Sequence, residues 1–104
     1  MVFGFNSNVA SAQDVYTYTY KGYEIYVDDE SVNGYIDDFT CRVGLKNLES
    51  GEFSHEKIRY ITNDDIIAVD ESGEKFSVHP MSHPPLWAVY MKAITYLHKN
   101  LSKT

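Results

Sequence analysis

The sequence predicts an α+β fold in which an antiparallel sheet of about five strands, a meander of hairpins, is covered on one face by one C-terminal helix. Three observations support this prediction. Apolar and polar side chains alternate with a period of two in several segments up to residue 78, and turn-forming residues separate these segments. After residue 85 the apolar side chains recur at helical spacing instead. A helix laid on one face of such a sheet buries the apolar side of both.

A single domain is expected because 104 residues are too few for two hydrophobic cores of useful size. We place this domain at residues 14–104 and interpret residues 1–13 as a flexible leader. Ala10-Ser11-Ala12 looks like a small-residue signal-peptidase site and keeps an exported origin open, but neither a basic segment nor a long apolar stretch precedes it. The cytoplasm is therefore the expected location.

The clearest predicted element is a hairpin. Thr and Tyr alternate from Val15 to Tyr20, Lys21-Gly22 provides a two-residue turn, and Tyr23 to Val27 alternates again. This register places three pairs on one apolar face, namely Tyr20 with Tyr23, Tyr18 with Ile25, and Tyr16 with Val27. The opposite face, which is expected to be exposed to solvent, carries Thr17, Thr19, Glu24 and Tyr26.

Asn33-Gly34 is a strong hairpin signal inside the acidic segment 28–38. A two-residue turn at this position would place Glu30 opposite Asp37, which is a pair of like charges. It would also bring Ile25 and Arg42 to the same face of the sheet. One register cannot satisfy both ends, so we expect either a β-bulge or an irregular acidic loop over residues 28–38.

Two longer strands are predicted next. In the first, which ends near Asn47, one side carries Phe39, Cys41, Val43 and Leu45, and the other carries Thr40, Arg42 and Lys46. Residues 49–52 have the composition of a turn, and the second strand runs from about Phe53 to Ile61. Its alternation is poor because Phe53 shares a side with His55, Lys57 and Arg59. We therefore expect a bulge or a late start in this strand.

The last predicted elements are a short hairpin and the helix. Residues 66–69 and 75–78 flank a turn in which Gly73 takes a left-handed conformation. Prolines at 80, 84 and 85 end the sheet, and Ser82 or His83 is the expected helix N-cap. The apolar stripe of the helix consists of Leu86, Tyr90, Ala93, Ile94, Leu97 and Leu101.

The composition argues against several classes of partner. The formal net charge is -6, and residues 1–52 hold nine acidic but three basic side chains, so a nucleic-acid partner is not expected. No stretch of about 18 apolar residues is present, so we expect no membrane partner. The single cysteine, Cys41, lies in an alternating apolar run, which indicates a small buried hydrophobe rather than a nucleophile.

The segment from Asp29 to Thr40 resembles the calcium loop of EF-hand proteins. Oxygen-bearing side chains stand at loop positions one, three, five and nine, and Gly34 stands at position six. The twelfth position, a bidentate Glu in that family, is Thr40, and the flanking segments have the pattern of strands. An EF-hand is therefore rejected. The alternative function is a weaker calcium-like site made of Asp29, Ser31, Asn33 and Asp37.

The sequence shows neither a G-x-S-x-G nucleophile motif nor a phosphate-binding glycine loop. Its carboxylates cluster in predicted turns, where water holds the pKa of such groups near its ordinary value. We therefore expect no catalytic residues and no cofactor, and we favour a role other than catalysis. A small enzyme stays open as a third hypothesis, which a deep pocket holding His, Tyr or carboxylate groups in mutual contact would favour.

The remaining expectation is a small, acidic, non-catalytic protein-interaction module. By analogy of size and charge, it could be an inhibitor or an immunity-type protein that binds a basic partner. Nine tyrosines fit such a role, because tyrosine combines apolar area with a polar tip. The candidate partner-binding residues are Tyr16, Tyr18, Tyr26, Asp28, Asp29, Glu30, Asp37 and Asp38. A tyrosine-bearing sheet edge could also pair two copies into a homodimer.

Overall fold

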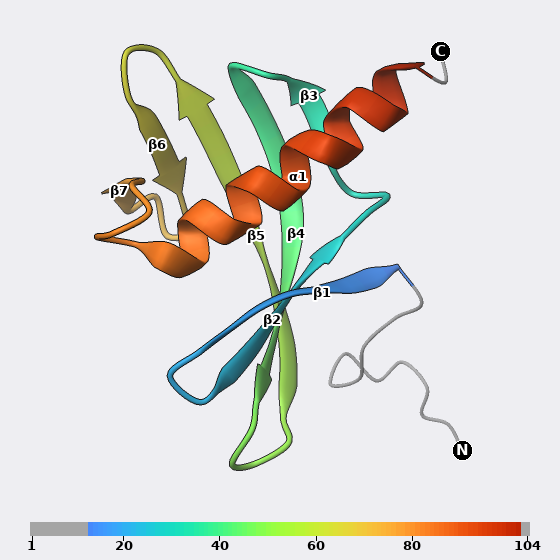
Figure 1. Ribbon diagram of the computed structural model, residues 1–104, viewed down its shortest axis with the longest axis vertical. Coiled ribbons are helices and arrows are strands. Elements are labelled where there is room, and N and C mark those ends of the chain that lie inside the picture. Colours follow the sequence, from blue (N-terminus) through green and yellow to red (C-terminus); the bar gives the residue numbers. More distant parts are fainter. Residues whose placement is uncertain (1–12, 103–104) are drawn as a thin grey trace.

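In the computed structural model, one long helix lies across a twisted antiparallel sheet (Figure 1). The structure describes the backbone of residues 13–102 and the side chains of residues 13–97. The elements are β1 (Asp14–Tyr20), β2 (Tyr23–Asp28), β3 (Asn33–Tyr35), β4 (Asp38–Asn47), β5 (Phe53–Thr62), β6 (Ile66–Val69), β7 (Lys75–Ser77) and α1 (Pro84–Ser102). The strand order is β1-β2-β4-β5-β6-β7, and β3 pairs with β4.

The predicted α+β class and the C-terminal helix are confirmed. The sheet has seven strands rather than about five, and β3 is a strand that the alternation pattern did not predict. Of the predicted leader, residues 1–13, Gln13 alone lies among the described residues, and its carbonyl accepts the amide of Asp29 at 3.1 Å. Within the described part of the chain, no helical stretch has the length and apolarity that a bilayer crossing requires.

The helix covers the central part of one sheet face, which we call the inner face. It begins at Pro84, directly after His83, whose carbonyl accepts the amide of Trp87 at 3.0 Å, as expected for an N-cap residue. The helix buries Val89, Tyr90, Ala93 and Leu97 against Ile25, Val27, Phe39, Cys41, Ile58, Tyr60 and Ala68. The hydroxyl of Tyr60 donates to the Leu86 carbonyl at 2.8 Å, which ties the helix to β5.

The first hairpin follows the predicted register at its turn and departs from it further back. Tyr20 pairs with Tyr23 and Tyr18 pairs with Ile25, but a bulge between Tyr16 and Tyr18 then shifts the register. Tyr16 therefore pairs with Tyr26 instead of Val27, so the predicted pairing of Tyr16 is wrong. The bulge turns Tyr16 to the outer face of the sheet, where its ring meets that of Tyr26 at a centroid distance of 5.9 Å.

The predicted irregularity in β5 is absent. β4 and β5 pair without a register shift from Asp38 opposite Ile61 to Lys46 opposite Phe53. The alternation is poor because Phe53 is 3% exposed although it lies on the outer face. There it packs on Tyr26 at a ring-centroid distance of 5.3 Å, over the space that Gly44 leaves by lacking a side chain.

The turn predicted at Asn33-Gly34 lies three residues later. Residues 29–32 form a loop after β2, and the chain then pairs β3 with β4 through a tight turn that places Tyr35 opposite Asp38. Gly34 pairs with Phe39 within β3, and a Cβ at Gly34 would meet the Asp38 carbonyl oxygen at 2.5 Å. The loop thus resolves the register conflict, because β2 and β3 pair with different parts of β4.

Candidate protein-binding surface

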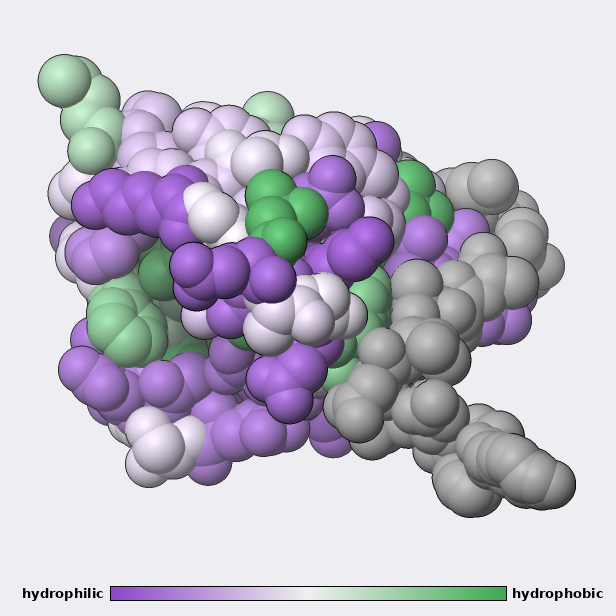
Figure 2. Space-filling view, turned by 90° about the horizontal axis from the view of Figure 1, so that it is seen from below, coloured by the Kyte–Doolittle hydropathy of each residue, from purple (hydrophilic) through white to green (hydrophobic). Residues whose placement is uncertain are grey.

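The inner face is open where the sheet extends past the start of the helix. Figure 1 shows the turns of the β1–β2 and β4–β5 hairpins reaching beyond α1. A groove of about 380 Å³ lies at this end, and we call it the hairpin groove. It is lined by Tyr20, Tyr23, Ile25, Leu45, Ser54 and Pro85. Figure 2 views the molecule from this end and shows a hollow with hydrophobic side chains at its floor.

Strand register explains why these side chains meet. Ile25 pairs with Leu45, which in turn pairs with Ser54, so the three form one row across β2, β4 and β5. Tyr20 and Tyr23 face each other at the hairpin turn, where Lys21 and Gly22 have positive φ angles of 47° and 84°. The groove therefore depends on the tight turn at Lys21-Gly22 and on the pairing of strands that lie far apart in the sequence.

A second cavity, of about 230 Å³, adjoins the hairpin groove and shares Tyr23, Leu45 and Ser54 with it. It adds Asn47, Glu52 and Phe53 from the β4–β5 turn. The turn is ordered by Asn47, whose Oδ1 accepts the amides of Glu49 and Ser50 at 2.9 and 3.1 Å. The two cavities together surround the tip of the sheet, so a partner could contact both.

Charged side chains of both signs lie near the groove. Glu49 and Glu52 are exposed in the β4–β5 turn, and no ion pair among the described side chains involves either of them. Two lysines also stand at this end of the sheet. Lys46 pairs with Phe53, and Lys21 Nζ lies 5.1 Å from the centre of the Tyr20 ring, as in a cation–π contact. A basic partner would meet these carboxylates without first displacing an internal salt bridge.

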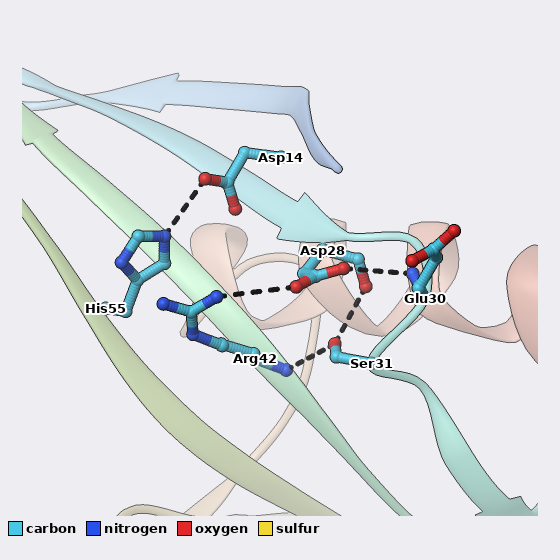
Figure 3. A network of polar contacts seen from close by, with 6 residues as sticks. All are labelled: Asp14, Asp28, Glu30, Ser31, Arg42 and His55. Atoms are coloured by element: carbon cyan, nitrogen blue, oxygen red, sulfur yellow. Dashed lines mark hydrogen bonds and ion pairs between the residues drawn. The ribbon is translucent and has the colours of Figure 1, made fainter. Parts of the chain in front are cut away.

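On the outer face, β1 and β5 are joined by a buried polar pair (Figure 3). His55 Nε2 lies 3.0 Å from Asp14 Oδ2, and the two side chains are 9% and 0% exposed. His55 also packs on Phe53 at a ring-centroid distance of 5.0 Å. The His55 Nδ1 atom is buried without a hydrogen-bond partner. The imidazole lines a cavity of about 180 Å³ together with Arg42, Glu56, Lys57 and Glu71.

This pair lacks the parts of a nucleophilic site. No hydroxyl or thiol within residues 13–97 hydrogen-bonds to the imidazole of His55. Cys41 is fully buried, and burial raises the pKa of its thiol to about 12, so it stays protonated at neutral pH. The described residues therefore contain a carboxylate and an imidazole in contact, but no activated nucleophile beside them.

The predicted acidic partner-binding residues have different environments. Asp28 is buried, accepts the Glu30 amide at 3.0 Å, and lies 3.5 Å from Arg42 (Figure 3). Asp38 binds Arg59 through two hydrogen bonds of 2.9 and 2.7 Å, and that guanidinium lowers the pKa of the Asp38 carboxyl. Glu30 and Asp37 are exposed. Arg42 and Arg59 therefore neutralise part of the negative charge of the 28–38 segment.

The predicted tyrosines also differ in environment. Tyr16 is 51% exposed on the outer face of edge strand β1. Tyr18 is half-buried and stacks on Tyr20, a residue of the hairpin groove, at a centroid distance of 6.2 Å. Tyr26 is half-buried and donates to Glu24 at 2.9 Å, and burial together with this bond raises the pKa of its phenol. Tyr16 and Tyr26 therefore lie together on the outer face, whereas Tyr18 lies on the inner face.

The residues of the alternative calcium-like set come from the 29–32 loop, from β3 and from the β3–β4 turn. Ser31 Oγ donates to the Asp28 carbonyl at 2.7 Å and accepts the Arg42 amide at 2.8 Å, so both roles of this hydroxyl are already used. Asn33 belongs to β3, and Asp37 lies in the β3–β4 turn. Asp29 Oδ1 is buried without a partner. Among the described residues, no group of three or more His, Cys, Asp or Glu side chains is placed to hold a metal ion.

Sequence reasoning did not predict any of the six residues of the hairpin groove as binding residues. The signal that could have found them is the register itself, since the predicted pairing of Tyr18 with Ile25 extends to Leu45 once β2 is paired with β4. Comparison with known proteins adds no assignment, because no family model, curated protein or solved structure matches this chain.

Proposed function

We propose that this chain is a non-catalytic protein-binding module that holds a basic partner at the hairpin groove. The observation that carries the proposal is an open groove with aromatic and aliphatic walls, beside exposed carboxylates that form no ion pair with the described side chains. Aromatic side chains in a concave apolar site are typical of the residues that dominate binding energy at protein interfaces. The net charge of -6 supports a basic partner through long-range attraction.

Other exposed apolar side chains support the same role. Tyr23 is 42% exposed and Leu48, in the β4–β5 turn, is 47% exposed, so the apolar surface continues past the rim of the groove. Tyr16, Glu30 and Asp37 remain candidates for a wider contact area, since their side chains are exposed. We do not include Asp28, because its side chain is buried and hydrogen-bonded within the fold.

The test uses two tyrosines as matched variants. Tyr23→Ser removes a wall of the hairpin groove, and Tyr35→Ser removes an equally bulky exposed ring from β3, away from the groove. We expect proteins of the native host to be retained by the wild type and by Tyr35→Ser but lost by Tyr23→Ser in quantitative affinity capture. Recombinant preparations of the retained proteins are then titrated by calorimetry at 50 and 300 mM salt.

Weaker binding at the higher salt concentration is expected, because the partner is basic and exposed charges are screened. Retention of the same proteins by all three baits would show that the groove is not the binding site. Binding that is indifferent to salt would remove the electrostatic part of the proposal.

The calcium-like alternative stays a hypothesis, since Ser31 is already hydrogen-bonded and the four residues are divided among the 29–32 loop, β3 and the β3–β4 turn. Thermal melts with and without millimolar calcium test this alternative, because an ion that binds the native state raises the unfolding midpoint.

A further inference from the structure

The half of β5 that is nearest the hairpin groove has one edge to which no strand of the described residues is paired. β5 runs from Phe53 to Thr62, but its pairing with β6 covers Arg59 to Thr62 alone. From Phe53 to Ile58 the neighbour among the described strands is β4, on one side. We call residues 53–58 of β5 the open edge. Unpaired strand edges of this length are templates for a further strand.

The direction of the backbone groups follows from one contact. The Lys57 amide donates to Glu71 Oε2 at 3.1 Å, so it faces away from β4. Backbone groups alternate in direction along a strand, so the amides and carbonyls of Phe53 and His55 face away from β4 as well. The open edge therefore presents these two residues to an added strand, while the Glu71 side chain occupies the amide of Lys57.

Cavities lie on both sides of this edge. Ser54 lines the hairpin groove and the adjoining cavity. His55 and Lys57 line the third cavity, of about 180 Å³, on the side of Arg42. An added strand sends successive side chains to opposite faces of the sheet, so its alternate residues would reach these cavities in turn. This is the arrangement in which strand addition combines backbone hydrogen bonds with side-chain selectivity.

Carboxylates near the open edge indicate which side chains would be accepted. Glu52 is exposed at the start of β5, and Glu56 is half-buried in it. Burial raises the pKa of Glu56, and the neighbouring Asp70 and Glu71 raise it further, so the ionised carboxyl stands in an unfavourable environment. A Lys or Arg side chain placed beside Glu56 would relieve this cost.

We propose that the open edge binds an extended segment of the protein partner by β-strand addition, and that this segment alternates apolar residues with Lys or Arg. The inference rests on the proposed function and specifies how the partner is held. A second copy of the chain fits less well, since edge-to-edge pairing of two copies would bring Glu52 and Glu56 of both near one another.

The test uses synthetic heptapeptides of alternating valine and lysine, with blocked ends, added to the full-length ¹⁵N-labelled protein. One control peptide replaces every lysine with glutamate. Two further control peptides keep the lysines but carry N-methyl groups on alternate residues, one peptide at the odd positions and the other at the even positions. The N-methyl groups remove the amide protons that pairing with a strand needs. The readout is the backbone amide spectrum, in which shifts at Phe53 to Lys57 locate the peptide.

We expect the lysine peptide to shift the resonances of the open edge, and the glutamate and N-methylated peptides to do so much more weakly. Glu56→Gln should lower the affinity for the lysine peptide about two- to fivefold, as for a partly exposed ion pair. Asp64→Asn, which removes a charge of the same sign from the exposed turn between β5 and β6, should leave the affinity unchanged.

Equal binding of the N-methylated peptides would overturn the inference, since no backbone pairing would then be involved. No shift at the open edge with any peptide at millimolar concentration would also overturn it, as would a dimer of the free protein held together by this edge. These results leave the proposed function standing if capture of a partner still depends on Tyr23. Loss of that dependence refutes the proposed function separately.

Discussion

Gly44 is the residue whose small size has the clearest consequence in this protein. It pairs with both Tyr26 and His55 in a row across β2, β4 and β5. A Cβ at this position would lie 2.8 Å from two ring carbons of Phe53 and 3.4 Å from the Cβ of Tyr26. The missing side chain thus lets the ring of Phe53 pack over Gly44 on the outer face, where it forms a small second core with Tyr26 and His55.

Gly44→Ala is expected to destabilise the fold by about 1–3 kcal/mol, because the added methyl group displaces the ring of Phe53. Urea unfolding followed by circular dichroism measures this change. Adding Phe53→Leu to Gly44→Ala should cost less than the sum of the two single changes, since the smaller side chain makes room. Additive costs would contradict the proposed steric contact.

Glu56 gives a prediction on pH dependence. Its raised pKa means that the folded state binds the proton more tightly than the unfolded state does. The stabilising contribution of this group is therefore complete below its unfolded pKa and is lost as the pH rises through its folded pKa. At pH 7, Glu56→Gln should raise the urea midpoint, and below about pH 4 the gain should vanish.

The exposed carboxylate of Glu52 provides the control, and Glu52→Gln should leave the midpoint unchanged at both pH values. A lower midpoint for Glu56→Gln at pH 7 would show that the charged carboxyl stabilises the fold. The same substitution is expected to weaken binding of a cationic strand, so its effects on stability and on affinity should have opposite signs.

At the scale of elements, the helix is held to the sheet by one apolar stripe. Leu97 is 1% exposed in that stripe, whereas Met91 is 43% exposed on the other side of α1. Leu97→Ala should cost about 2–5 kcal/mol of unfolding free energy through lost burial and the cavity left behind. Met91→Ala should change it by less than about 0.5 kcal/mol. Thermal and urea melts compare the two, and similar losses would contradict the observed packing.

The strands show where local pattern and tertiary packing disagree. Alternation correctly predicted which β4 residues face the helix, since Phe39, Cys41 and Val43 are all buried there. It misplaced Tyr16, because a bulge near Thr17 reverses the face of the residues before it. In β5 it suggested an irregularity that does not exist, because a strand with apolar contacts on both faces cannot alternate cleanly.

At the scale of the whole molecule, strand order predicts which amides exchange with solvent. β4 is paired on both sides, so its amides should be among the most protected in hydrogen exchange. Along the open edge, protection should alternate. The amides of Ser54 and Glu56 point to β4 and should exchange about tenfold or more slowly than those of Phe53 and His55.

Exchange measured by NMR on the free protein checks this pattern. Equal protection of neighbouring residues from 53 to 56 would mean that something already covers the open edge in solution, and strand addition there would lose its premise.

The candidate binding surface was less accessible to sequence reasoning than the fold. The acidic segment was singled out because its charges are adjacent in the sequence, yet Asp28 is buried and Asp38 is bound to Arg59. The hairpin groove depends on Ile25, Leu45 and Ser54 standing in one row, which requires the pairings of β2, β4 and β5.

Local signals were enough to predict three elements, namely the Lys21-Gly22 turn, the alternating strand β4 and the helix that begins at a proline. Periodicity and turn chemistry act within a few residues, so they can be read without knowing what lies opposite. Tertiary structure alone decided the face of Tyr16, the burial of Phe53 over Gly44, and the contact of Asp14 with His55, 41 positions apart. Those features depend on cross-strand packing, because the residues that stabilise them come from segments far apart in the chain.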